Sequence, residues 1–221
     1  MELLIVLGRV FSSAAANVFQ KKFTHKGLHS LFIVMLSYLV LACISLPLLI
    51  LVEYNAIDHS FWINILLAAL LDMAGTLFLV LSLSKTDLSV FGPLNAYKVV
   101  ISMILALIFL GEVPSFQGLS GVIIILLGSF LLFPPATTAS ANRLSQLFMQ
   151  RGVQYRFLSI LLFSIGTLPL KNAVLSGGAL ATTVYWCLFG LPLSIGLYYW
   201  FGGKRWQMDW QAAREHRSHF L

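Results

Sequence analysis

The feature that most constrains this chain is a series of long apolar stretches, each long enough to cross a bilayer as a helix. A membrane-spanning helix needs about 20 mainly apolar residues. Charged residues make up 10% of the chain, whereas soluble domains carry about 25%. The sequence therefore predicts an all-α, polytopic integral membrane protein with about seven transmembrane helices. These lie at approximately 3–20, 30–52, 61–83, 89–110, 115–133, 157–175 and 179–201.

The longest connector divides these helices into two groups. Residues 134–156 begin with two prolines and continue with small polar residues, a composition typical of loops. We therefore interpret residues 1–140 as a first unit of five helices. Residues 141–221 form a second unit with two helices and a polar tail.

A weak repeat supports this division. Lys22 is followed by Pro47 in the next helix, and Lys171 is followed in the same way by Pro192. Five helices separate the two copies, so the second copy would insert upside down. Inverted repeats of this kind recur among membrane transporters.

The positive charges lie mostly on one side of the expected helices. Cytoplasmic connectors carry an excess of Lys and Arg, so this bias predicts an N-terminus outside the cell. The net charge of +6 then reflects orientation in the membrane, and we expect no binding to nucleic acid. The basic residues on this side are Lys21, Lys22, Lys26, Lys85, Arg143, Arg151, Arg156, Lys204, Arg205, Arg214 and Arg217.

Lys98 lies near the centre of the expected helix 89–110. A charge at that depth costs about 2.5–3.5 kcal/mol on insertion scales. Asn95 and Ser102 share its helix face, so one face of this helix is polar. Pro93, about one turn earlier, removes a backbone hydrogen bond and is expected to kink the helix.

Asp72 lies at the centre of the preceding helix, and a tight connector makes the two helices antiparallel neighbours. The charges of Asp72 and Lys98 then lie at similar depth, and we expect them to pair directly or through water. Charges inside spans usually pair or line a cavity, so both residues are candidates to bind a substrate or a coupling proton. A buried ion pair that only fixes helix packing is the alternative.

Two further basic residues lie inside expected spans. Arg9 either extends to the interface or faces a cavity, and Lys171 lies beside Pro169, a second candidate kink. Together with Lys98 they make the interior positive, which slightly favours a substrate with an anionic group. The candidate cavity residues are therefore Lys98, Asp72, Asn95, Tyr97, Arg9 and Lys171.

An ordered set of residues runs through the third to fifth helices. Pro93 lies in the fourth helix, Gly111 and Glu112 end it, and Gly121 and Gly128 share a face of the fifth. Small residues such as these two glycines let helices pack closely. In this order and spacing, the segment resembles the EamA-type half of the drug/metabolite transporter superfamily. A lysine ending the first helix of each unit is similar as well.

The resemblance implies ten helices in two inverted five-helix repeats around a central cavity. It implies a permease that works by alternating access in the bacterial inner (cell) membrane, with no cofactor and no enzymatic activity. We therefore expect the second repeat of this chain to be incomplete, and a homodimer is one way to close the cavity. The resemblance also implies a cytoplasmic N-terminus, which opposes the charge bias and leaves the orientation open.

Three classes of function fit these features. The leading one is a secondary transporter for a small metabolite or drug-like compound. A seven-helix receptor or sensor fits the charge-based orientation but not the short connectors, and a non-transporting scaffold subunit would need no central charges. The sequence contains no Walker, GxGxxG, GxSxG or HExxH motif, and its histidines lack a third ligand nearby, so we expect neither catalysis nor a metal site.

Overall fold

In the computed structural model, all regular elements among the described residues are helices. The structure describes residues 2–54, 57–86, 88–132, 149–202 and 208–211. The all-helical class is confirmed, and the bounds of the first five helices differ from the expected ones by only a few residues. The elements are α1 (Glu2–His25), α2 (Ser30–Ser45), the 3₁₀ helix η1 (Leu46–Leu51), α3 (His59–Lys85), α4 (Leu88–Leu110), α5 (Phe116–Leu132) and α7 (Arg151–Phe201).

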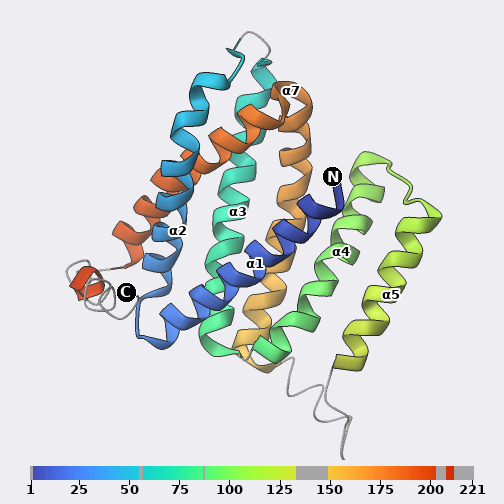
Figure 1. The fold of residues 1–221 in the computed structure, drawn as a ribbon, viewed down its shortest axis with the longest axis horizontal. Helices are drawn as coiled ribbons and strands as arrows, with labels where there is room; N and C mark the ends of the chain where they lie inside the picture. Colours follow the sequence, from blue (N-terminus) through green and yellow to red (C-terminus); the bar gives the residue numbers. More distant parts are fainter. Residues whose placement is uncertain (1, 55–56, 87, 133–148, 203–207, 212–221) are drawn as a thin grey trace, which may run out of the picture.

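The last element, α7, is a helical hairpin. A straight helix of its 51 residues would extend about 76 Å, more than twice the thickness of a bilayer core. The backbone breaks at Gly178, where φ is 77°, a conformation that glycine adopts without a steric penalty. Figure 1 shows α7 rising beside α3 and then turning back towards α2. We name residues 151–177 the first arm and residues 179–201 the second arm.

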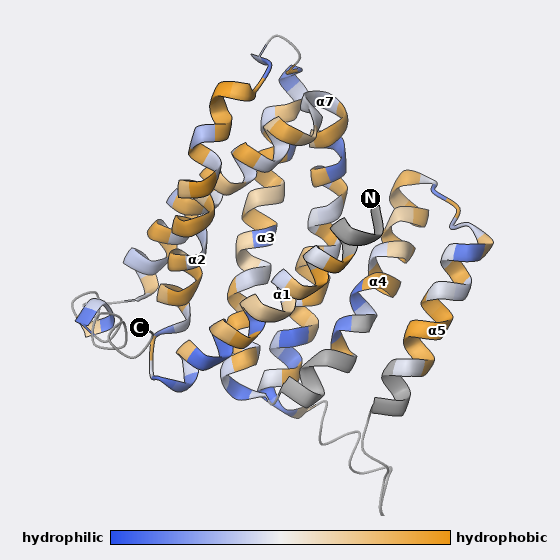
Figure 2. Ribbon diagram, viewed as in Figure 1, coloured by the Kyte–Doolittle hydropathy of each residue, from blue (hydrophilic) through white to orange (hydrophobic). Residues whose placement is uncertain are grey.

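Three of the described helices are long and apolar enough to cross a membrane: Ser30–Leu51, His59–Lys85 and the whole of α7. Two shorter apolar segments, Tyr97–Leu110 and Phe116–Gly128, lie in α4 and α5. Hydrophobic residues run along most of each helix, and hydrophilic ones gather towards the helix ends (Figure 2). The number of spans and the inverted repeat remain predictions.

The centre of the bundle is the contact between α3 and the first arm. An added Cβ at Gly75 would lie 2.9 Å from the Phe163 ring, and one at Gly166 would lie 3.3 Å from Leu71. These glycines let the two backbones approach closely, as small residues do in membrane helices. An added Cβ at Gly121 or Gly128 would meet nothing within 4 Å, so the described contacts do not test their expected packing role.

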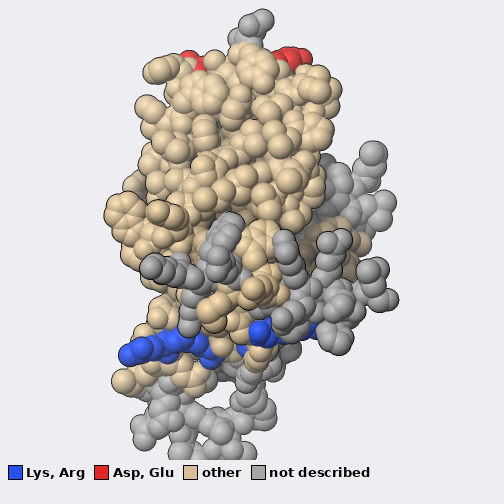
Figure 3. Space-filling view, turned by 90° about the vertical axis from the view of Figure 1, so that its left-hand side faces the viewer, with Lys and Arg blue, Asp and Glu red and all other residues tan. Residues whose placement is uncertain are grey.

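Many of the charged residues on one face of the bundle lie at one or the other of its two ends. Figure 3 shows Lys and Arg gathered near one end and Asp and Glu at the opposite end. The end of α1, with Lys21 and Lys22, and the end of α3, with Lys85, belong to the basic end. Glu53 and Asp58, which precede α3, belong to the acidic end. This separation agrees with the bias of basic residues on which the charge-based orientation rests.

The connector expected at 134–156 ends earlier than the sequence suggested. Residues 133–148 lie outside the described residues, but α7 already begins at Arg151. Arg156, which we had assigned to a connector, is therefore a helical residue and is only 2% exposed. The reason is that no proline lies between Arg151 and Arg156, and this segment packs against α3 as the first turns of the helix.

The polar tail also contributes to the packed bundle. The Tyr198 hydroxyl donates a hydrogen bond to Oδ2 of Asp209 at 2.6 Å, and Asp209 is 6% exposed. The ring of Trp210 lies edge-on to Phe32 of α2, with centroids 5.5 Å apart. Residues 208–211 thus return to pack on α2 and the second arm.

The Lys21 side chain caps the C-terminal end of α3. Its Nζ donates hydrogen bonds to the carbonyl oxygens of Leu83 at 2.7 Å and Thr86 at 2.6 Å, and the residue is 9% exposed. The last carbonyls of a helix lack partners within it, and a cation is favourable there. This contact joins α1 to the end of α3.

We expect Lys21→Met to lower the thermal stability of the detergent-purified protein. Losing two charge-assisted bonds to buried carbonyls should destabilise the fold by about 1.5–3 kcal/mol. Lys22→Met, at the exposed neighbouring position, is the matched control and should have a much smaller effect. Equal melting temperatures for the two variants would contradict this role of Lys21.

Candidate functional site

A layer of polar side chains crosses the middle of the bundle. Asp72 lies at the midpoint of α3, and Lys98 lies one residue from the midpoint of α4. Polar groups at such depth are usually functional. The polar layer consists of Tyr38 from α2, Asp72 from α3, Lys98 and Ser102 from α4, Ser164 from the first arm and Trp186 from the second arm.

The Asp72 carboxylate joins three elements of this layer. Its Oδ2 accepts a hydrogen bond from the hydroxyl of Tyr38 at 2.9 Å, and the Trp186 side chain lies close enough to act as a second donor. Tyr38 is 2% exposed, and its ring lies 6.2 Å from that of Trp186. A carboxylate removed from water needs such partners. Sequence reasoning identified Asp72 but neither of its two donors.

Lys98 lies between α4 and the first arm. Its Nζ is 4.5 Å from the centroid of the Phe163 ring, within the range of a cation–π interaction. Its positive charge also acts on the Asp72 carboxylate. The two expected charges thus act on one another, and direct or water-mediated pairing stays a prediction. The expectation that their two helices are direct neighbours is wrong, because the first arm of α7 packs against both α3 and α4 and lies between them (Figure 1). One turn further along α4, Ser102 donates a hydrogen bond to Ser164 at 3.1 Å.

Arg156 is a functional candidate that sequence reasoning missed. Its Nη2 donates a hydrogen bond to Oδ1 of Asn95 at 2.5 Å, so a predicted cavity residue of α4 contacts the first arm. Ser159 donates to the carbonyl oxygen of Gly75 at 2.8 Å. If the helix had been expected to begin at Arg151, the i, i+3 spacing of Arg156 and Ser159 would have placed both on one face.

The other predicted residues are distributed along the bundle. The Tyr97 ring lies 6.1 Å from that of Phe157 in the first arm. Lys171 forms an ion pair with Glu112, in which both side chains are about half exposed, so it lies outside the polar layer.

Pro169 lies within the first arm, and the backbone of α7 breaks at Gly178 rather than there. The side chains of Arg9 and Pro93 lie outside the described residues.

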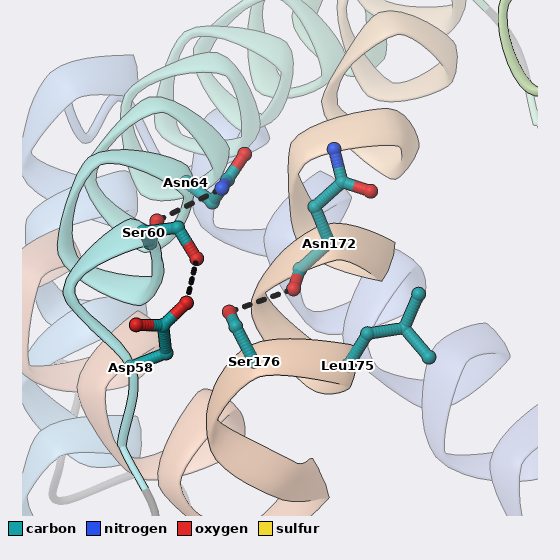
Figure 4. Close-up of a pocket in the computed structure, with 6 residues that line it drawn as sticks. All are labelled: Asp58, Ser60, Asn64, Asn172, Leu175 and Ser176. Atoms are coloured by element: carbon teal, nitrogen blue, oxygen red, sulfur yellow. Dashed lines mark hydrogen bonds between the residues drawn. The ribbon is translucent and has the colours of Figure 1, made fainter.

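A second polar site is an open hollow between α3 and the first arm, with a volume of about 600 Å³. Figure 4 shows side chains from the two helices facing each other across it. Oδ1 of Asp58 accepts a hydrogen bond from the His59 amide at 2.7 Å, and its Oδ2 accepts one from Ser60 at 2.9 Å. The α3–α7 hollow is lined by Asp58, Ser60, Asn64, Asn172, Leu175 and Ser176.

Comparison with known proteins gives a family. The model of the EamA-like transporter family matches residues 1–133, more than half of the chain. No curated protein and no solved structure matches. The resemblance seen in the third to fifth helices is thereby confirmed. The chain is an integral membrane protein that belongs to the EamA-like transporter family, within the drug/metabolite transporter superfamily.

Proposed function

We propose that this protein is a secondary transporter that moves a small metabolite or drug-like compound across the membrane by alternating access. The observation that carries this proposal is the pair of opposite charges in the polar layer, Asp72 and Lys98, near the midpoints of α3 and α4, which both pack against the first arm of α7. Membership of a transporter family supports the same function. Transporter substrate sites commonly lie near the bilayer midplane.

The two charges suggest how a substrate is held. Lys98 attracts an anionic group, and Asp72 accepts hydrogen bonds from a donor group or binds a coupling proton. Asp72 contacts Tyr38 of α2 and Trp186 of the second arm, while Lys98 contacts Phe163 of the first arm. A substrate that competes for these contacts would change how the two arms pack, which is what alternating access requires.

The proposal is tested by counterflow in proteoliposomes. Purified protein is reconstituted with an unlabelled compound inside, and uptake of the same labelled compound is measured for a panel of amino acids and short carboxylates. We expect at least one compound to exchange faster than through protein-free liposomes. A pH gradient that drives its accumulation would identify a coupling proton.

The main alternative is a non-transporting scaffold subunit. It predicts no counterflow with any compound of the panel and stable co-purification with a larger complex. It also predicts that replacing Lys98 and Asp72 together by apolar residues leaves function unchanged, since a pair that only fixes packing can be replaced by apolar residues.

A further inference from the structure

The α3–α7 hollow gathers five polar residues in a chain that is 59% hydrophobic. It lies at the end of the bundle where α3 begins, opposite the basic end. We propose that this hollow is an entrance site, which binds the ammonium or hydroxyl group of the transported molecule before it reaches the polar layer. The inference rests on the proposed transport function and adds to it a second binding site and the chemistry of its ligand.

The lining of the hollow is rich in hydrogen-bond acceptors. Each carboxylate oxygen of Asp58 accepts one hydrogen bond, and a carboxylate has about four acceptor positions. The Asn64 amide nitrogen donates to the Ser60 carbonyl oxygen at 2.8 Å, which leaves its amide oxygen as another acceptor. A ligand with N–H or O–H groups can donate hydrogen bonds to these acceptors. A positively charged ligand is also attracted by the Asp58 carboxylate.

Helix capping accounts for only part of this arrangement. Asp58 is the N-cap of α3, and a cap uses one side-chain oxygen. The cap requires neither Asn64, one turn further along α3, nor Asn172 on the facing arm. In Figure 4 the side chains of Asn64 and Asn172 lie on opposite walls of the hollow. Polar groups from two separate helices thus converge on the same space.

The hollow and the polar layer both contain residues of α3 and of the first arm of α7. On α3, Asn64 and Asp72 are two i, i+4 steps apart, with the small buried residue Ala68 between them. On the first arm, the same spacing joins Asn172 to Ser164. Residues at i and i+4 share a helix face, and eight residues span about 12 Å. Because α3 and the first arm pack closely at Gly166, a molecule released from the hollow reaches Asp72 only when these two helices separate during the transport cycle.

The first test measures whether the hollow is filled with water and favours cations. Asn64→Cys and Ile63→Cys are made in full-length protein that carries Cys43→Ala and Cys187→Ala, and both are reconstituted in liposomes. Ile63 is the matched control, because it lies at the same depth and is 62% exposed on another side of α3. The probes are a membrane-impermeant cationic methanethiosulfonate and its anionic sulfonate counterpart.

We expect the cysteine at position 64 to react faster than that at 63, by on the order of tenfold, and to prefer the cationic reagent by a similar factor. Asp58→Asn should abolish the preference while keeping the helix cap, because Asn caps as well as Asp. Equal rates at the two positions, or no preference for the cation, would overturn the proposal.

The second test separates this inference from the transport function itself. With a compound that shows counterflow, Asn172→Leu should raise KM severalfold for molecules approaching from the hollow side and leave KM unchanged from the other side. Equal effects from both sides, or none, would overturn the entrance site while the transport function stands. Absence of counterflow in the wild type would instead reject the transport function, and the entrance role with it.

Discussion

We expect Lys98→Leu and Asp72→Leu each to reduce counterflow to the level of protein-free liposomes, although both variants should insert and purify like the wild type. A leucine at mid-depth is favourable in lipid, so insertion is not impaired. Binding, however, loses a charged group at mid-depth, where the positive charge of Lys98 acts on Asp72. Removing one member of a buried charge pair costs about 2–5 kcal/mol, which is roughly 30-fold or more in affinity.

Additional variants separate a binding role from a structural one. The double variant Lys98→Leu/Asp72→Leu removes both charges, so a pair that only fixed packing would leave transport intact. We expect the double variant to be inactive. Tyr38→Phe, which removes one hydrogen bond to Asp72 but keeps the ring, should have an intermediate effect. Wild-type counterflow in both single variants would show that the polar layer does not bind substrate.

Gly190→Ala should lower the thermal stability of the purified protein, although alanine normally favours a helix. An added Cβ at Gly190 would lie 2.2 Å from Cε1 of Tyr38, whose ring is buried and cannot move without losing its bond to Asp72. Overpacking of this kind costs about 1–3 kcal/mol. The second arm would also be pushed away from α2.

Gly196→Ala is the matched control for this prediction. It lies on the same arm, and an added Cβ there would meet nothing within 4 Å. The control should be neutral, or stabilising by up to about 1 kcal/mol, because alanine has the higher helix propensity. If thermal unfolding in detergent shifts equally in the two variants, Gly190 is not a packing contact between α2 and α7.

The helices themselves could be predicted from the sequence because lipid leaves the backbone few alternatives. Long apolar stretches must form helices in a bilayer, so α2 to α5 begin and end close to the expected residues. The start of α7 could not be found in this way. Residues 151–156 are too polar to be read as part of a span, and only packing against α3 shows that they continue the helix.

The candidate site could be predicted only in part. Lys98 and Asp72 stand out because a charge is rare in an apolar stretch, and depth in the membrane follows from position along a helix. Tyr38 and Trp186 do not stand out, because aromatic residues are common in this chain. The acceptors of the α3–α7 hollow are likewise ordinary helix-end residues until Asn64 and Asn172 are seen on facing walls.

The sequence by itself determined the helical class, the membrane location, the family and the depth of the two central charges. Each of these depends on composition or on spacing along one helix. The tertiary structure alone decided that Tyr38 and Trp186 bind Asp72, that Arg156 is buried against Asn95, and that Lys21 closes α3. The physical reason is that these contacts join residues far apart in the chain, and their existence depends on which helix faces meet.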